Sequence, residues 1–145
     1  MKFLFHFYDL HQRAGIQRAI SELSNALVEN GHEVVLASCT SRAEAAFSLD
    51  KRIVLEEVPY PESKEARFAT WAKKIVWGIR QEHILRRIVK RHRPSVVVDH
   101  GTALGLMYPG KSMAGIPFVL QRHFPVKTFP FGKFLYKALS LLGTR

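Results

Sequence analysis

Alternating apolar and polar stretches divide the first third of the chain into short strands and an amphipathic helix. Residues 2–8 and 33–38 are mainly apolar, which is typical of strands covered on both faces in a parallel sheet. Between them, apolar residues recur every three or four positions, the spacing of one helical face. That face consists of Ile16, Ala19, Ile20, Leu23, Ala26 and Leu27. Gly31 ends the helix, so this region predicts a strand–helix–strand unit.

The same pattern predicts three further strands, at residues 52–58, 96–98 and 118–121. Residues 62–92 form the longest helical stretch, and their apolar stripe changes face near Gly78, which predicts two helices or one kinked helix. Two shorter segments lie between the predicted strands. Residues 41–50 are predicted to be helical or irregular, and residues 102–114 to form a helix of small and apolar residues.

These elements predict an α/β fold, with an open, mostly parallel, Rossmann-like sheet of about five strands and helices on both faces. Right-handed crossovers favour the strand order 3-2-1-4-5. A chain of 145 residues is long enough for one domain and too short for two full Rossmann units.

The formal charge of +10 is concentrated in one segment. Residues 64–93 contain ten Lys or Arg and two Glu, so +8 of the charge lies there. Such a segment attracts polyanions, among them anionic lipid and phosphorylated substrates. The candidate membrane-binding residues are Trp77, Arg86, Arg87, Lys90 and Arg91. Nucleic acid is an unlikely partner, because the basic residues alternate with an aliphatic stripe and no recognition motif is present.

Several other classes of site have no support in the sequence. The single cysteine, Cys39, allows no internal disulfide, and this is consistent with a reducing cytoplasm. No run approaches 18 apolar residues, so we expect a cytoplasmic protein with peripheral contact to the inner face of the membrane. The sequence contains no dinucleotide fingerprint, P-loop or serine-hydrolase motif. A metal site built from His6, His11, His100 and His123 has no supporting spacing, so we expect none.

Two groups of motifs resemble glycosyltransferase family 4. The first group consists of Ala14-Gly15, Gln17-Arg18, the helix that follows them, and Asn-Gly-His-Glu-Val at residues 30–34. In the same places the family usually has Gly-Gly-x-Glu-Arg, a helix and Gly-His-x-Val. The second is Arg-Pro-x-Val-Val-Val-x-His at residues 93–100, then Gly-Ile-Pro, an apolar strand and a terminal histidine. Two departures are Ala14 in place of the first glycine and Gln17 in place of the common glutamate.

The resemblance implies the N-terminal, acceptor-binding domain of a metal-independent GT-B enzyme that uses a nucleotide-sugar as donor substrate and no other cofactor. We expect residues 1–145 to be one such domain, ending before its last strand and lacking the donor-binding domain. That second domain would be supplied in cis or by a partner chain. Three interpretations of the chain stay open: it is a truncated relic, one part of a split enzyme, or a binding module built on this half.

The carboxyl ends of the first, fourth and fifth predicted strands are the expected site, since ligands of open α/β sheets bind there. The resemblance assigns the catalytic position to His123 and places Ala14 and Gly15 near the donor phosphates. The candidate substrate-binding residues are Tyr8, Ala14, Gly15, Arg18 and His100. Two alternatives stay open: Gly15 in a plain strand-to-helix turn, and His100 as a strand-end histidine bonded to a neighbouring loop.

The leading hypothesis is the acceptor-binding half of a glycosyltransferase that acts on a membrane-associated, lipid-linked or glycan acceptor and is incomplete alone. The alternative is a non-catalytic basic module that docks on anionic lipid surfaces. The two hypotheses are not exclusive, because one chain can bind both a lipid surface and an acceptor presented on it.

Overall fold

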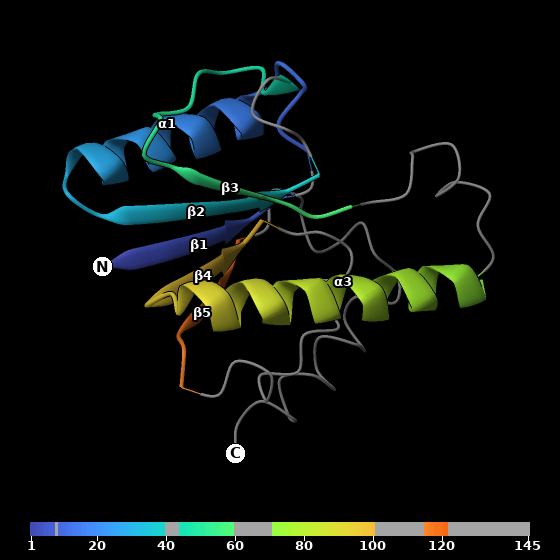
Figure 1. The fold of residues 1–145 in the computed structure, drawn as a ribbon. Coiled ribbons are helices and arrows are strands. Elements are labelled where there is room, and N and C mark those ends of the chain that lie inside the picture. Colours follow the sequence, from blue (N-terminus) through green and yellow to red (C-terminus); the bar gives the residue numbers. More distant parts are fainter. Residues whose placement is uncertain (8, 40–43, 60–70, 101–114, 122–145) are drawn as a thin grey trace.

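A five-stranded parallel sheet forms the centre of the protein in the computed structural model, which describes residues 1–7, 9–39, 44–59, 71–100 and 115–121 (Figure 1). The strands are β1 (Lys2–His6), β2 (Glu33–Ser38), β3 (Val54–Glu57), β4 (Val96–Asp99) and β5 (Phe118–Leu120). Their order is β3-β2-β1-β4-β5, and every neighbouring pair is parallel, which confirms the predicted topology.

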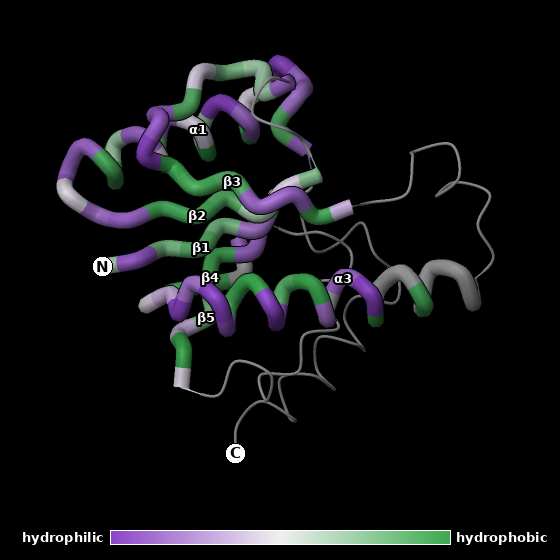
Figure 2. The backbone as a smooth tube through the Cα atoms, viewed as in Figure 1, coloured by the Kyte–Doolittle hydropathy of each residue, from purple (hydrophilic) through white to green (hydrophobic). Residues whose placement is uncertain are grey.

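Two helices cover opposite faces of this sheet, as expected for a doubly wound arrangement (Figure 1). They are α1 (Gly15–Glu29) and α3 (Trp71–His92). In the part of the chain that the structure describes, hydrophobic residues gather in the central strands (Figure 2). Because successive side chains of a strand point to opposite faces, each strand supplies both halves of the core.

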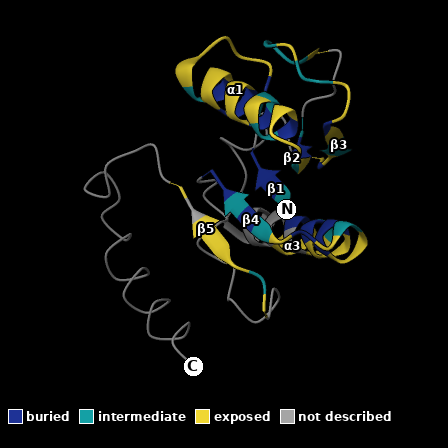
Figure 3. Cartoon of the chain, turned by 90° about the vertical axis from the view of Figure 1, so that its left-hand side faces the viewer, coloured by how far each residue is buried: buried dark blue, intermediate teal, exposed yellow. Residues whose placement is uncertain are grey.

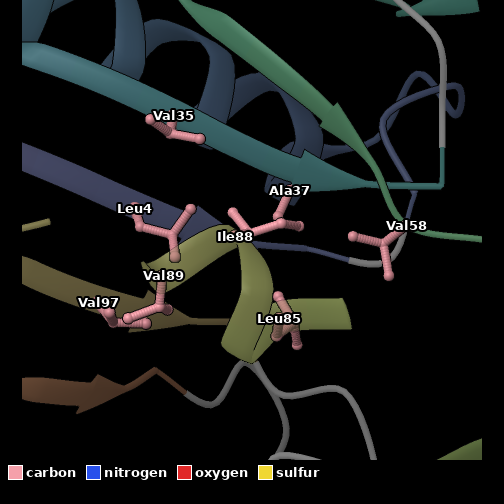
Figure 4. Packing of buried hydrophobic residues seen from close by; sticks show 8 residues of the cluster. All are labelled: Leu4, Val35, Ala37, Val58, Leu85, Ile88, Val89 and Val97. Carbon is pink, nitrogen blue, oxygen red and sulfur yellow. The ribbon is translucent and has the colours of Figure 1, made fainter. Parts of the chain in front are cut away.

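The half of the core beneath α3 joins strand residues to one side of that helix (Figure 4). It contains Leu4, Val35, Ala37, Val58, Leu85, Ile88, Val89 and Val97, all buried. The half beneath α1 contains Phe5, Phe7, Leu10, Ile20, Val28, Val34, Leu36 and Ile53. Phe5 and Leu4 are adjacent in β1 and lie in different halves, so the register of this strand determines which side chains reach each face.

The buried face of α1 differs from the predicted aliphatic stripe. Its buried residues are Gln17, Ile20, Ser21, Ser24 and Val28. Leu23 is 45% exposed, and Ala19 and Ala26 are also exposed, so the prediction for these three was wrong. The helix is rotated by about one residue, and small serine side chains face the sheet in place of larger aliphatic ones.

Gly31 makes the tight turn from α1 into β2. Its φ of +79° lies in the left-handed region, where a side chain is strained. The turn satisfies the last carbonyls of the helix, because Gly31 N donates to Val28 O at 3.1 Å and His32 N to Leu27 O at 3.0 Å. This geometry explains why the helix ends where the sequence predicts.

The second helix, α3, is continuous from Trp71 to His92, so the predicted division into two helices near Gly78 was wrong. The first part of the predicted stretch, 62–70, lies outside the described residues. Its C-terminal half packs on the sheet through Leu85, Ile88 and Val89, whereas its N-terminal half extends past the strand ends (Figure 1). A helix that leaves the sheet has no single face to bury along its whole length. The change of apolar stripe marks that departure.

Candidate functional site

A histidine and an aspartate from neighbouring strands meet at the carboxyl edge of the sheet. His6 and Asp99 are register partners at the ends of β1 and β4, and His6 Nδ1 lies 3.0 Å from Asp99 Oδ1. Both side chains are buried, with 8% and 1% of their surfaces exposed. A carboxylate accepts from Nδ1–H, which leaves Nε2 of a neutral imidazole as an acceptor. Within the described residues, Asp99 Oδ2 has no hydrogen-bond partner.

Sequence reasoning placed Asp99 at this edge but did not pair it with His6. The only local signal is a histidine inside an otherwise apolar strand, at a position where a hydrophobic residue is expected. The partner lies 93 residues away, so the pairing follows from the parallel register of β1 and β4.

His100 lies on the other face of the sheet, towards α1. Its ring packs near Phe5, with centroids 5.8 Å apart, and against Phe7 edge-on at 6.0 Å. Its backbone N–H donates to His6 O at 3.0 Å, which continues the pairing of β1 and β4. His100 and His6 are thus close along the sheet edge but separated by the sheet itself.

The first turn of α1 also opens at this edge. Ala14 is extended, with φ −126° and ψ 166°, and its side chain supplies no cap to the helix. Gly15 is exposed, and a Cβ added there would meet no atom within 4 Å. The helix therefore begins with backbone N–H groups that can donate to an anion.

Arg18 lies one turn further along α1 and is bound to Glu22. Its Nε donates to Glu22 Oε1 at 2.7 Å, and both side chains are exposed. This hydrogen bond raises the pKa of Arg18 above its ordinary value. The guanidinium keeps its charge and is held along the helix surface.

Two of the predicted site residues, Tyr8 and His123, lie outside the described residues. Gln121, the last residue that the structure describes, donates its backbone N–H to Asp99 O at 2.8 Å. The structure thus brings together the ends of β1 and β4, the chain just after β5 and the start of α1.

The predicted basic patch is divided between two sides of α3. Arg91 Nη1 lies 2.9 and 3.1 Å from the two carboxylate oxygens of Glu56, and His92 Nε2 lies 2.6 Å from Oε1 of the same residue. Arg86 and Lys90 instead line a hollow of about 520 Å³ at the C-terminal end of the helix. Trp77 belongs to α3, and its side chain lies outside what the structure describes.

Burial raises the pKa of Glu56, but the hydrogen bonds from His92 and Arg91 outweigh it and leave the pKa below its ordinary value. The ionised Glu56 side chain therefore links β3 to the end of α3 through its contacts with Arg91 and His92. Arg91 contributes to this link between β3 and α3, whereas Arg86 and Lys90 line the hollow.

No group of three potential metal ligands gathers among the residues that the structure describes. In the same part of the chain, neither helix is long and apolar enough to cross a membrane.

A parallel sheet in this order, with helices on both faces, defines a Rossmann-like domain. The model of Glycosyltransferase Family 4 matches residues 13–143, so the chain belongs to this family, as the motifs predicted. It is a glycosyltransferase domain.

Among solved structures, the chain is similar to the apo form of the lipopolysaccharide outer core galactosyltransferase WaaB, with a TM-score of 0.60 and 13% identity. The match covers 94% of this chain and 37% of the galactosyltransferase, so the chain spans little more than a third of that enzyme's length. At this identity the shared feature is the fold. A comparison with curated proteins found no match.

Proposed function

We propose that this chain is the acceptor-binding half of a glycosyltransferase that moves sugar from a nucleotide-sugar to a membrane-associated or glycan acceptor. The observation that carries the proposal is the family match over residues 13–143 within a domain that spans 37% of a galactosyltransferase. A second, donor-binding domain would complete the enzyme, either in cis or in a partner chain.

The reaction forms a bond between the acceptor oxygen and the anomeric carbon, breaks the bond to the nucleotide diphosphate, and releases the proton of the acceptor hydroxyl. It requires the hydroxyl to be held against the anomeric carbon. Positive charge and helix dipoles stabilise the departing diphosphate. A metal-independent enzyme obtains this stabilisation from its own groups.

Three features of the chain fit these needs at the carboxyl edge. The uncapped first turn of α1, at Ala14 and Gly15, offers backbone donors to the diphosphate. Arg18 adds a charge one turn away, partly neutralised by Glu22. His123, two residues after the chain passes Asp99, would serve as the acid or base for the acceptor hydroxyl. Tyr8 and His100 are the remaining candidate substrate-binding residues.

The proposed half-site predicts weak donor binding by the chain alone. Calorimetry with a panel of UDP- and GDP-sugars should show no affinity tighter than micromolar, because the donor contacts belong to the other domain. Sub-micromolar affinity for any of these sugars would overturn the assignment to the acceptor half.

The basic segment supports a second role, as a module that docks on anionic lipid. We propose a cytoplasmic location, with the domain held peripherally on the inner face of the membrane. The observation that favours this role is the net charge of +8 in residues 64–93.

A further inference from the structure

One exposed side of α3 carries a continuous line of residues spaced three and four apart. These residues are Val76, Ile79, His83, Arg86, Lys90 and Arg93, the last lying one residue after the helix end. We call this line the α3 stripe. All six residues are exposed, and Figure 3 shows the exposed side of the helix opposite its buried side. The spacing places them on one helical face.

The two ends of the α3 stripe differ in chemistry. Val76 and Ile79 are 62% and 50% exposed and lie one turn apart, so they form a small apolar patch. Arg86, Lys90 and Arg93 are basic and lie at the other end. Segments that lie in a membrane interface bind through buried apolar area together with electrostatic attraction to anionic lipid, and the α3 stripe offers both.

The basic end lines a cavity. The hollow of about 520 Å³ is bounded by Arg86, Val89, Lys90, Arg93, Pro94 and Ile116. Within the described part of the chain, no carboxylate lies within ion-pair distance of Lys90 or Arg93. Three cationic side chains around an apolar floor suit an anionic group attached to a hydrocarbon chain.

Arg93 also occupies a strained backbone position. Its φ of +47° lies in the left-handed region, which glycine or asparagine normally fills after a helix. Its N–H donates to Val89 O at 2.8 Å and closes the last turn. An arginine is unfavourable in this backbone conformation, but its side chain lines the hollow.

We propose that the α3 stripe docks on an anionic lipid surface, with a lipid phosphate seated among Arg86, Lys90 and Arg93 and with Val76 and Ile79 at the edge of the acyl region. This surface differs from the basic patch expected from sequence. Arg87 lies four residues after His83 and three before Lys90, so it borders the α3 stripe, whereas Arg91 is bound to Glu56. The docking proposal rests on the lipid-docking role proposed above and is independent of the sugar-transfer proposal.

Helix stability alone does not account for the α3 stripe. Cations in the last turn of a helix interact favourably with its dipole, and Lys90, Arg91 and His92 all lie there. That effect explains neither the exposure of Val76 and Ile79 nor a basic residue with positive φ.

Docking through the α3 stripe would orient the domain. The stripe runs from the hollow, near the start of β4, to the part of α3 that extends past the strand ends (Figure 1). From Val76 to the end of α3 it is about 25 Å long. A helix lying flat on the membrane would therefore place the N-terminal half of α3 on the lipid surface beyond the carboxyl edge of the sheet, on the side where a lipid-linked acceptor would be presented.

The test is sedimentation of the full chain with vesicles of phosphatidylcholine containing 30% phosphatidylglycerol at low salt. A triple variant, Arg86→Gln, Lys90→Gln and Arg93→Asn, should lower the partition coefficient about 100-fold, because each basic residue near the surface contributes about fivefold. Asparagine at position 93 preserves the left-handed turn. Val76→Ser with Ile79→Ser should lower it at least tenfold and make the remaining binding more sensitive to salt.

The matched control removes the same charge from elsewhere on the surface through Arg13→Gln, Lys51→Gln and Arg52→Gln, three exposed residues outside α3. We expect this control to bind within about threefold of the wild-type chain, since those residues lie away from the lipid. Equal losses for control and test variants would overturn the proposal, because they would show a response to net charge alone.

Two further outcomes would also overturn it. One is binding to pure phosphatidylcholine vesicles equal to that on the anionic ones. The other is binding to a short DNA duplex through Arg86, Lys90 and Arg93 without any binding to vesicles. Circular dichroism melting of each variant checks that the fold is intact. No donor or acceptor is present in this assay, so its failure is distinguishable from failure of the glycosyltransferase proposal.

Discussion

His6 and Asp99 join β1 to β4 at the carboxyl edge of the sheet, with His6 Nδ1 3.0 Å from Asp99 Oδ1 and both side chains buried. Removing one member of such a pair leaves the other polar group buried without compensation. We therefore expect His6→Leu to lower the free energy of unfolding by about 3 kcal/mol. Urea denaturation measures this change.

The double variant His6→Leu with Asp99→Val separates the pair from the packing around it. Apolar residues of similar volume leave no buried polar group, so the double variant should recover most of the loss. If the double variant is less stable than His6→Leu alone, the carboxylate is held by groups other than His6.

The topology was predictable and this pair was not, and the difference has a physical cause. Apolar runs and right-handed crossovers depend on local sequence and on chain geometry, and they predicted the order β3-β2-β1-β4-β5. The contact between His6 and Asp99 depends on the register of two strands whose paired residues are 93 positions apart. Nothing local to either residue encodes that register.

The face of α1 shows a second limit of the pattern. Hydrophobicity favours Leu23 as a core residue, yet Leu23 is exposed and Ser24 is fully buried. A helix packed closely on a sheet needs small side chains at the contact, and an apolar stripe does not reveal this requirement. Among the candidate substrate-binding residues, His100 directly follows β4, so its position at the carboxyl edge of the sheet could be predicted from the end of that strand.

The link that Glu56 forms between β3 and α3 depends on pH. The pKa of Glu56 in the folded protein is below its ordinary value of 4.5, so the ionised group contributes stability above that value. The contribution disappears as the pH falls through the lower folded-state pKa. We expect Glu56→Gln to cost about 1 kcal/mol at pH 7 and less at pH 4, because the contribution declines below the ordinary pKa and is lost only as the pH falls through the folded-state pKa.

The neighbouring Glu57 is exposed and serves as the control. Glu57→Gln should change the free energy of unfolding by less than about 0.5 kcal/mol at either pH. Thermal or urea unfolding at pH 7 and pH 4 would measure both variants. A cost for Glu56→Gln that is the same at both values would show that ionisation of Glu56 does not stabilise the fold.

Ser24 lies in the contact between α1 and the sheet with 0% of its surface exposed. Within the described residues its Oγ has no hydrogen-bond partner. Removing an unsatisfied buried hydroxyl removes its desolvation cost, so we expect Ser24→Ala to be neutral or to stabilise by up to about 1 kcal/mol. A loss greater than 1 kcal/mol would show that the hydroxyl is bonded in solution.

A larger residue at the same position tests whether the contact is tight. Ser24→Val adds volume between the helix and the strands and should destabilise by about 1–3 kcal/mol. If valine is tolerated as well as alanine, the close approach of α1 is not what selects serine at this position.

The last prediction concerns His123, which follows Gln121, the residue whose N–H donates to Asp99 O at the carboxyl edge. In an enzyme that contains the donor-binding half, supplied by ligation or co-expression, His123→Ala should lower turnover about 100-fold or more, the usual contribution of one positioned acid or base. Its melting temperature should stay nearly unchanged. The control is His32→Ala, because His32 lies at the amino edge of the sheet, with its ring 5.5 Å from that of Phe3. This control should retain nearly full turnover, and equal losses of turnover in the two variants would remove the special role of His123.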